Sequence, residues 1–499
     1  MTMKRDGAVR FWKTAQRVVL WAGLVPALSA CVPASQPVET GLTTPERFDA
    51  TQTASAPVID PNWPTLFGAP DLMTLIEQAR ANNPDIASAI ARLQQAEAIT
   101  QQAEAFLLPS VNGSGTGARN RSPATLKRST PPYNETISNT FSMGLSASYA
   151  LDVWGRYRAA YAAQSAGLEA NLYDRQAVEL VTAVAVTTSY LNALAAHDRL
   201  AITQENIATA SRILKAVRSR LEVGTASALD VAEQESVLAA LKATTPALEQ
   251  QIAQNRVQLA VLLGRVPEGF TLKPRSLKSL TVPQVQAGLP AHLLIRRPDI
   301  ARAEASLRAA SFNVQSARAA LLPNISLTAS GGFESLTLKN LLQPHALFAS
   351  GVAGITEPLF DGGNLRAQLD GQTARQAELL ATYRKTVLTA LADVENALVA
   401  VQQTRKQEVL QQEAVNASRR AYEISEERLR AGTIDLVTLL AVQQNLFQAQ
   451  ENLLQSRLSR LQAALGLIQA LGGGFILPAE APARQQFNHD SPDDSETKP

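Results

Sequence analysis

The side chains that most often perform chemistry are few in this sequence and are poorly arranged for it. Histidine occurs only four times in 499 residues, at His197, His292, His345 and His489. Because metal-binding histidines recur at short, regular spacings, this scatter predicts no metal site. Asp230, Glu233 and Glu235 form an acidic cluster, yet no histidine or second cluster accompanies it. We interpret the three as a solvated or lumen-facing helix surface and predict neither an enzyme nor a cofactor.

The thiol of Cys31, the only cysteine, stands directly after an export signal. Basic residues precede an apolar run of about 11 residues, which is too short to remain as a spanning helix. The run ends Leu28-Ser29-Ala30-Cys31, which resembles the bacterial lipobox. That resemblance implies cleavage before Cys31 and attachment of several acyl chains, which together make a stable anchor. A free buried thiol is the alternative. Val32, rather than an aspartate, follows, and this favours the outer membrane.

Charge and hydropathy exclude further classes of protein. The whole chain has a formal net charge of +2, and removing the basic signal leaves about −2. This balance disfavours a nucleic acid as partner. No run of 18 apolar residues follows the signal, so no transmembrane helix is predicted. A structure that spans a membrane would then have to be a β-barrel.

Two halves of the chain repeat one order of elements. A shift of about 214 positions aligns residues 84–87 with 298–301, both reading Pro-Asp-Ile-Ala. About 14 of the 26 positions over 84–109 are identical at this shift. A shift of about 208 aligns residues 220–225 with 428–433. An internal duplication is therefore predicted.

Each half contains short alternating segments after a helix that ends at Leu-Leu-Pro. Residues 141–151 and 325–330 alternate apolar side chains with Ser, Thr or Gly, which predicts strands with one apolar and one small polar face. A sandwich strand gives a similar pattern, but its solvent face usually carries Lys or Glu. Two strands flank each polar loop, at roughly 119–139 and 334–344, giving four strands per chain.

Four strands cannot close a barrel, and an open edge in lipid leaves backbone groups unpaired. Closure must come from further copies of the chain. About eight strands from two copies would enclose only side chains, whereas about twelve from three leave room for a pore. The small polar face favours three copies.

Very long helices are predicted after each pair of strands. Residues 156–222 contain no proline and almost no glycine, so they predict a helix ~100 Å long, and residues 364–431 repeat this pattern. Each run ends at Gly-Thr, and return helices are predicted over 226–263 and 434–470. Such hairpins are stable only when packed against neighbours. A plain coiled-coil scaffold is the alternative, but it would not need the strands.

A series of motifs resembles the TolC family of outer-membrane factors. They are Leu262-Leu263-Gly264, Pro267, Leu289-Pro290, Leu293-Leu294, Arg296-Arg297-Pro298-Asp299-Ile300, Ala303-Glu304 and Leu321-Leu322-Pro323. With the lipobox, they are similar to the NodT/OprM lipoprotein branch, over about Asp71 to Gly474. Arg296 and Arg297 are interpreted as pairing and capping residues at the start of a helix.

The resemblance implies a homotrimer that closes a 12-stranded membrane β-barrel continued by a long periplasmic α-helical barrel. It implies a passive duct that exports drugs or other small molecules and joins a periplasmic adaptor and an inner-membrane pump of the RND type. A type I protein-secretion duct is one alternative, although such members usually lack the lipobox. A structural lipoprotein that spans the envelope without a pore is the other.

Site residues follow from the same resemblance. The adaptor-docking tips of the two hairpins are Val223, Gly224, Thr225, Ala431, Gly432 and Thr433. Relatives often carry aspartates just after the second tip, where this chain has Val437, Thr438 and Ala441. The charges near a periplasmic aperture would instead come from Asp230, Arg428, Arg430 and Asp435, of which Asp230 belongs to a solvated or lumen-facing surface.

The expected organisation has six segments. Residues 1–30 are the lipoprotein signal and 31–70 an extended tether. The first efflux repeat covers 71–264, an inter-repeat equatorial segment 265–297, and the second repeat 298–474. Residues 475–499 are a disordered polar tail.

Overall fold

The computed structural model describes residues 41, 48, 59–122, 136–273, 275–285, 290 and 296–475. Cys31, most of the expected tether and the tail from 476 on lie outside the described residues. The chain divides into two compact units. The sheet unit includes Ala91–Leu172 and Arg302–Arg384, and the hairpin unit includes Leu42–Ile90, Tyr173–Ala301 and Lys385–Pro499. Each unit therefore draws on both halves of the duplication.

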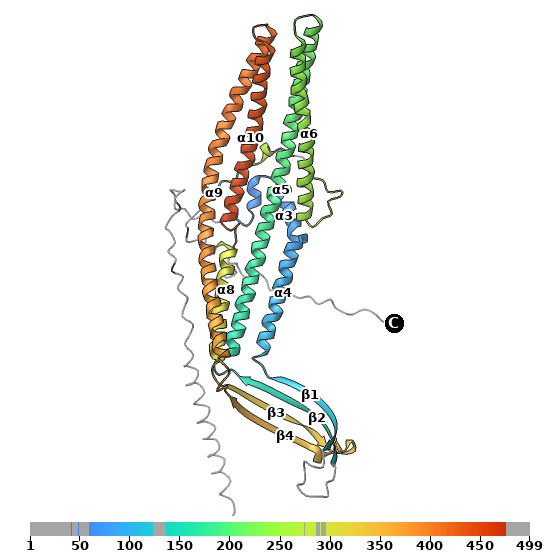
Figure 1. Cartoon of the computed structure of the whole chain (residues 1–499), viewed down its shortest axis with the longest axis vertical. Coiled ribbons are helices and arrows are strands. Elements are labelled where there is room, and N and C mark those ends of the chain that lie inside the picture. Colours follow the sequence, from blue (N-terminus) through green and yellow to red (C-terminus); the bar gives the residue numbers. More distant parts are fainter. Residues whose placement is uncertain are drawn as a thin grey trace, which may run out of the picture. The chain divides into compact units, whose positions relative to one another are not determined.

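Four antiparallel strands form the sheet, in the order β1-β2-β3-β4 (Figure 1). They are β1 (Ser110–Ser122), β2 (Thr136–Leu151), β3 (Asn324–Ser335) and β4 (Leu347–Thr356). The prediction of two strands in each half is confirmed. The first polar loop was predicted too long, because β1 and β2 pair as far as Ser122 and Thr136. Strands pair through hydrogen bonds of the backbone, which do not require apolar side chains. The two strands therefore continue through the polar residues that were predicted to form the loop.

The register gives the sheet two chemically different faces. Odd-numbered residues of neighbouring strands lie opposite one another, as Met143 with Phe333 and Leu327 with Ala353 show. That face is apolar over β2 and β3. The other face carries small hydroxyl side chains that bond across strands, with Oγ–Oγ distances of 2.8 Å for Ser110 and Ser148 and 2.7 Å for Ser330 and Ser350. The predicted alternation is confirmed in register as well as in sequence.

Glycines allow the two halves to approach closely where β2 meets β3. Gly144 and Gly332 lie directly opposite each other in the register. A Cβ at Gly144 would stand 2.8 Å from the carbonyl oxygen of Gly331, and one at Gly332 would stand 2.5 Å from the Cα of Gly144. Neither position has room for a side chain, because the nearby atoms belong to backbone.

Two long helical hairpins follow the strands. The first consists of α5 (Arg156–Glu222) and α6 (Ala228–Leu262), and the second of α9 (Asn364–Arg430) and α10 (Leu436–Ala470). All four helices begin and end within two residues of the predicted positions. One stretch of α5 is long and apolar enough to cross a membrane, contrary to expectation, although half of it is buried inside the chain. Val186, Tyr190 and Leu191 of α5 are core residues, which accounts for this apolarity.

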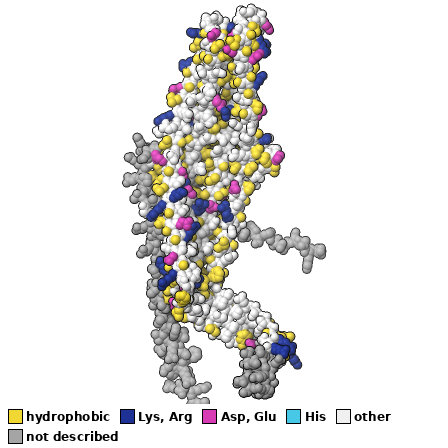
Figure 2. Space-filling view, in the orientation of Figure 1, with side chains coloured by type: hydrophobic (Ala, Val, Ile, Leu, Met, Phe, Trp, Pro, Cys, Tyr) yellow, Lys and Arg dark blue, Asp and Glu magenta, His cyan; other side chains and the backbone are white. Residues whose placement is uncertain are grey.

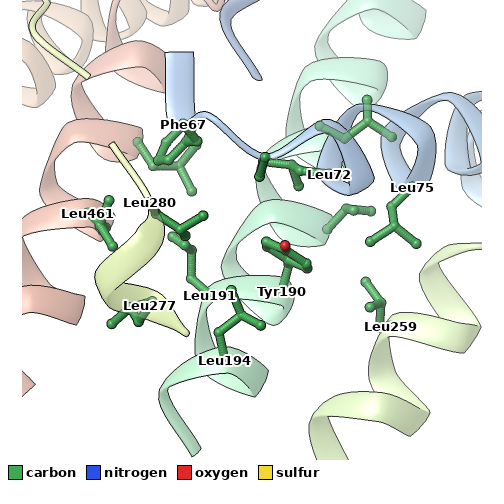
Figure 3. Close-up of a cluster of buried hydrophobic side chains, with 14 of the residues drawn as sticks. Phe67, Leu72, Leu75, Tyr190, Leu191, Leu194, Leu259, Leu277, Leu280 and Leu461 are labelled. Atoms are coloured by element: carbon green, nitrogen blue, oxygen red, sulfur yellow. The ribbon is translucent and has the colours of Figure 1, made fainter. Parts of the chain in front are cut away.

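The main hydrophobic core lies in the hairpin unit. It joins side chains of α5, α6 and α10 to the short helices η2 (Trp63–Phe67), α3 (Pro70–Asn82) and η4 (Leu277–Ser279) (Figure 3). Phe67 and Leu72 are fully buried there. Trp63, Phe67 and Ala69 belong to this core, so residues 63–70 are not an extended tether. A single helical turn has no readable period, which is why the composition of this segment was misleading.

Arg297 connects the start of α8 (Pro298–Ala319) to the second hairpin. Its guanidinium lies 2.7 Å from the carboxylate of Asp299 and 3.2 Å from that of Asp393, and donates to the carbonyl of Ala470 at 3.0 Å. Burial alone lowers the pKa of Arg297, but hydrogen bonds and charge from both aspartates offset this and leave the pKa raised. The pairing role predicted for Arg297 is confirmed.

We expect Gly332→Ala to destabilise the sheet by about 1–3 kcal/mol, because the new methyl group meets the backbone of β2. Gly354→Ala is the matched control, since its Cβ would meet only the Ser326 hydroxyl at 3.5 Å. The measurement is the temperature at which the purified protein loses its β-sheet signal in circular dichroism. Equal melting temperatures for the two variants would show that the close approach does not constrain the sheet.

Candidate functional site

The two hairpin tips have the same backbone geometry. At the first tip Gly224 has φ +78°, and at the second Gly432 has φ +72°. The amide of Thr225 donates to the carbonyl of Arg220 at 2.8 Å, and the amide of Thr433 donates to that of Arg428 at 2.9 Å. With the bonds from Gly224 to Leu221 and from Gly432 to Leu429, each tip is a Schellman motif. Glycine is favoured here because φ is positive. Crowding is not the reason, because nothing lies within 4 Å of an added Cβ.

Threonine completes each motif. The hydroxyl of Thr225 donates to the Arg220 carbonyl and that of Thr433 to the Arg428 carbonyl, both at 3.1 Å. The carbonyl therefore accepts from both the amide and the side chain of one residue. This accounts structurally for the Gly-Thr pair at both tips. The six predicted tip residues are all exposed.

The acidic residues predicted near the aperture act as helix caps. Ser227 and Asp230 form a capping box at the start of α6, with the amide of Ser227 donating to the Asp230 carboxylate at 2.7 Å. Asp435 caps α10 by accepting from the Thr438 amide at 2.9 Å and from its hydroxyl. These bonds, the hydroxyl first, lower the pKa of Asp435. The cap is therefore present at neutral pH and is lost only as the pH falls through that lowered pKa.

The arginines near the tips have different partners. Arg430 pairs with Glu426 within α9 at 2.6 Å. Arg220, which sequence reasoning missed, donates from Nη2 to the carbonyl of Leu429 at 3.1 Å and so links the two tips. Arg428 contributes its carbonyl to the second cap, and its side chain is exposed. A cavity of about 270 Å³ next to this link is lined by residues of α5, α9 and α10, which include Arg212, Tyr422 and Leu439.

The start of α10 carries no carboxylate on the three positions where relatives were expected to have aspartates. Val437 is 52% exposed, Thr438 belongs to the cap, and Ala441 is exposed. Two glutamines one to two turns into the return helices, Gln234 and Gln443, are 0% exposed. Gln234 donates to the carbonyl of Ala210 on α5 at 2.8 Å. Sequence reasoning missed both, because a glutamine on a helix is ordinarily assigned to solvent.

The acidic and histidine side chains that were considered for catalysis or metal binding do not form a site. Glu235 pairs with Arg218 of α5 at 2.5 Å, so two of the three residues of the predicted acidic cluster, Asp230 and Glu235, belong to a cap and an ion pair. His197 lies on α5 and His345 in the loop before β4. Within the described ranges no group of three potential metal ligands occurs.

We expect Gly432→Ala to open the second tip, because a left-handed conformation costs a residue with a Cβ about 1–2 kcal/mol. Amide hydrogen exchange at Thr433 should accelerate roughly tenfold, since the amide then loses its bond to Arg428 more often. Gly371→Ala, in the interior of α9 with free space around it, is the control and should leave the tip unchanged. Unchanged exchange at Thr433 in both variants would contradict the cap assignment.

Comparison with known proteins identifies the family. The family model described as "Outer membrane efflux protein" matches residues 75–265 and 289–473, one match in each half of the duplication. The pyoverdine export outer membrane protein OpmQ of Pseudomonas aeruginosa is 38% identical over 92% of this chain and 97% of its own length. The probable efflux pump outer membrane protein TtgC of Pseudomonas putida is 32% identical over 89% and 91%.

Solved structures show the same fold. The outer-membrane channel OprN superposes with a TM-score of 0.82 and 27% identity over 88% of this chain and 99% of that one. Its described function is that of a channel, and the matched family model describes efflux proteins, so the chain is not an enzyme. The two-faced sheet and the paired hairpin tips are accordingly parts of a conduit, and the chain belongs to the outer membrane efflux protein family, of the TolC type.

Proposed function

We propose that this outer-membrane channel works as a homotrimer whose three sheets close one 12-stranded barrel. The observation that supports this proposal is that β1 and β4 are the outer strands of the sheet. Within the described strands, each of them pairs with a neighbouring strand on one side only. In hydrocarbon, the unpaired backbone groups along each edge would cost several kcal/mol apiece. Pairing β4 with β1 of another copy satisfies both edges, and three copies leave room for a pore.

The hydroxyl-bearing face of the sheet supports a weakly selective lumen. Serine, threonine and glycine dominate its even-numbered positions, and Glu334 is the one acidic residue of the four strands. Small neutral donors and acceptors hold a passing solute only briefly, as conduction requires. The names of OpmQ and TtgC refer to export of pyoverdine and to an efflux pump. We therefore assign drugs or other small molecules as cargo, in preference to secreted proteins.

The tips support docking to a periplasmic adaptor, which would couple the channel to an inner-membrane pump of the RND type. Six exposed residues, three at each tip, are held by matching hydrogen bonds, and Arg220 fixes one tip against the other. A partner that recognises this motif finds it twice on each chain. This arrangement is unnecessary in a structural lipoprotein without a pore.

The stoichiometry and the pore can be tested together. Native mass spectrometry of the purified protein in mild detergent should give three chains, and planar bilayers containing it should show discrete single-channel currents. A monomer that conducts would refute closure by three sheets. A trimer that never conducts would favour the structural lipoprotein.

The lipid anchor is tested separately, because Cys31 lies outside the described residues. Cys31→Ser should abolish incorporation of radiolabelled palmitate, since the thioether can no longer form. Ala30→Gly, which retains a small residue before the cysteine, should still be labelled. Persistent labelling of Cys31→Ser would disprove lipidation at this position.

A further inference from the structure

The internal duplication extends to the register of the strands. Ser110 pairs with Ser148 in the first half, and Asn324 pairs with Thr356 in the second. The first pair becomes the second when β1 moves by 214 positions and β2 by 208, the same shifts that align the two halves of the sequence. All ten pairs between β3 and β4 arise from β1–β2 pairs in this way. The duplication therefore predicts which residues of neighbouring strands meet.

One pair of strands has no counterpart within the described strands. β2 belongs to the first half and β3 to the second, so their pairing links the two halves. Its counterpart under the duplication would join β4 to β1, yet these two strands lie at opposite edges of the sheet (Figure 1). The partner of β4 is then β1 of another molecule. Such a head-to-tail contact repeats from copy to copy and can close into a ring.

The register between β2 and β3 gives definite partners for this contact. Three of its pairs are Ser148 with Thr328, Ser146 with Ser330 and Leu151 with Ile325. When β2 moves forward by 208 positions and β3 back by 214, these become Thr356 with Ser114, Gly354 with Thr116 and Leu359 with Val111. Even-numbered residues again meet even-numbered ones. The hydroxyl-bearing face and the apolar face therefore each continue across the contact, which a slip of one residue would prevent.

The exposure of the edge residues agrees with this register. Leu151 and Ile325, which pair within the chain, are both half-buried. Their counterparts Leu359 and Val111 are 97% and 64% exposed. Figure 2 shows hydrophobic side chains open on the surface where the strands meet the helices. A neighbouring copy in this register gives each of the two a cross-strand neighbour, and burial of apolar surface stabilises such a contact by ~25 cal/mol per Å².

The contact between copies differs from its counterpart at one position. Gly144 opposite Gly332 becomes Val352 opposite Ala118. Both of the latter residues have a Cβ, so the strands keep the ordinary spacing of ~4.8 Å there. The close approach of β2 and β3 is therefore not repeated between copies.

We propose that the open edges of the sheet bind a second copy of this chain in one register, with β4 antiparallel to β1 of the next copy and Thr356 opposite Ser114. The hydroxyl groups of these two residues then face each other, as hydroxyl groups do at three places within the chain. The inference rests on the proposed trimer and adds which residues meet at each of its interfaces.

The test is disulfide formation in the full-length channel, with copper phenanthroline as the oxidant. Ser114→Cys combined with Thr356→Cys should give covalent dimers and trimers, because directly opposed Cα atoms lie ~4.5–5.5 Å apart, within disulfide range. β1 and β4 of one chain are three strand spacings, ~14 Å, apart, so this disulfide can form only between copies. Each introduced cysteine alone, beside the native Cys31, measures the background.

Two matched controls keep Thr356→Cys and move its partner by two residues on the same face, to Asn112→Cys or Thr116→Cys. In the proposed register these Cα atoms lie ~7–8 Å from that of Thr356, so cross-linking should be at least ~10-fold slower. Thr116→Cys combined with Gly354→Cys should cross-link rapidly, which would show that a cysteine at this position is reactive.

Native mass spectrometry of the reduced variants separates the register from the trimer. In a trimeric protein, faster cross-linking of Thr356→Cys through Asn112→Cys or Thr116→Cys, or no cross-linking of any pair, would overturn the register and leave the trimer standing. A protein that is only monomeric would overturn both.

Discussion

Every backbone amide and carbonyl within a lipid bilayer must have a hydrogen-bond partner, and this requirement governs the sheet of the channel. In the sheet β1-β2-β3-β4, backbone hydrogen bonds join three pairs of neighbouring strands within one chain. The outer edges of β1 and β4 are left unpaired within the described residues. In the proposed barrel, the composition of the two faces follows from the same surroundings, because one face would meet lipid and the other the solute pathway. Hydroxyl pairs such as Ser330 with Ser350 satisfy each other and need no charged partner. Assembly is thus built into the fold of the single chain.

The helical part obeys a different constraint. A 67-residue helix such as α5 or α9 has far more surface than a single return helix can cover. The largest hydrophobic core of the hairpin unit lies where η2, α3 and η4 pack against α5, α6 and α10. Arg297 adds a polar connection between α8, α9 and α10. Towards the tips, a smaller hydrophobic cluster of Val217, Leu436, Leu439 and Leu440 and the bond from Arg220 to Leu429 join the two hairpins.

Much of this architecture was predictable because long periodic elements carry strong signals. The duplication, the four strands and the bounds of α5 and α9 follow from spacing, proline and glycine. The bounds of the first loop and the structure of residues 63–70 were harder to predict. Backbone pairing of polar residues leaves no periodic pattern in the sequence, and neither does the burial of one short helical turn. At the tips, glycine indicated a cap, and the capping contacts of Asp230 with Ser227 and of Asp435 with Thr438 are also local, three residues apart, so the sequence could have indicated them. The burial of Gln443 depends instead on packing against other elements. The docking and aperture roles of these residues remain predictions.

The close approach of Gly144 and Gly332 has a consequence for biogenesis. The seam that they form joins the two duplicated halves within one polypeptide, so its closure is a first-order event whose rate is independent of protein concentration. The seam between β4 and β1 of another copy, in the proposed trimer, instead requires collisions between molecules. A newly exported chain can therefore complete its own sheet quickly and then wait with two reactive edges. At low expression this waiting time lengthens, and the half-finished sheet becomes the species most exposed to proteases and chaperones in the periplasm.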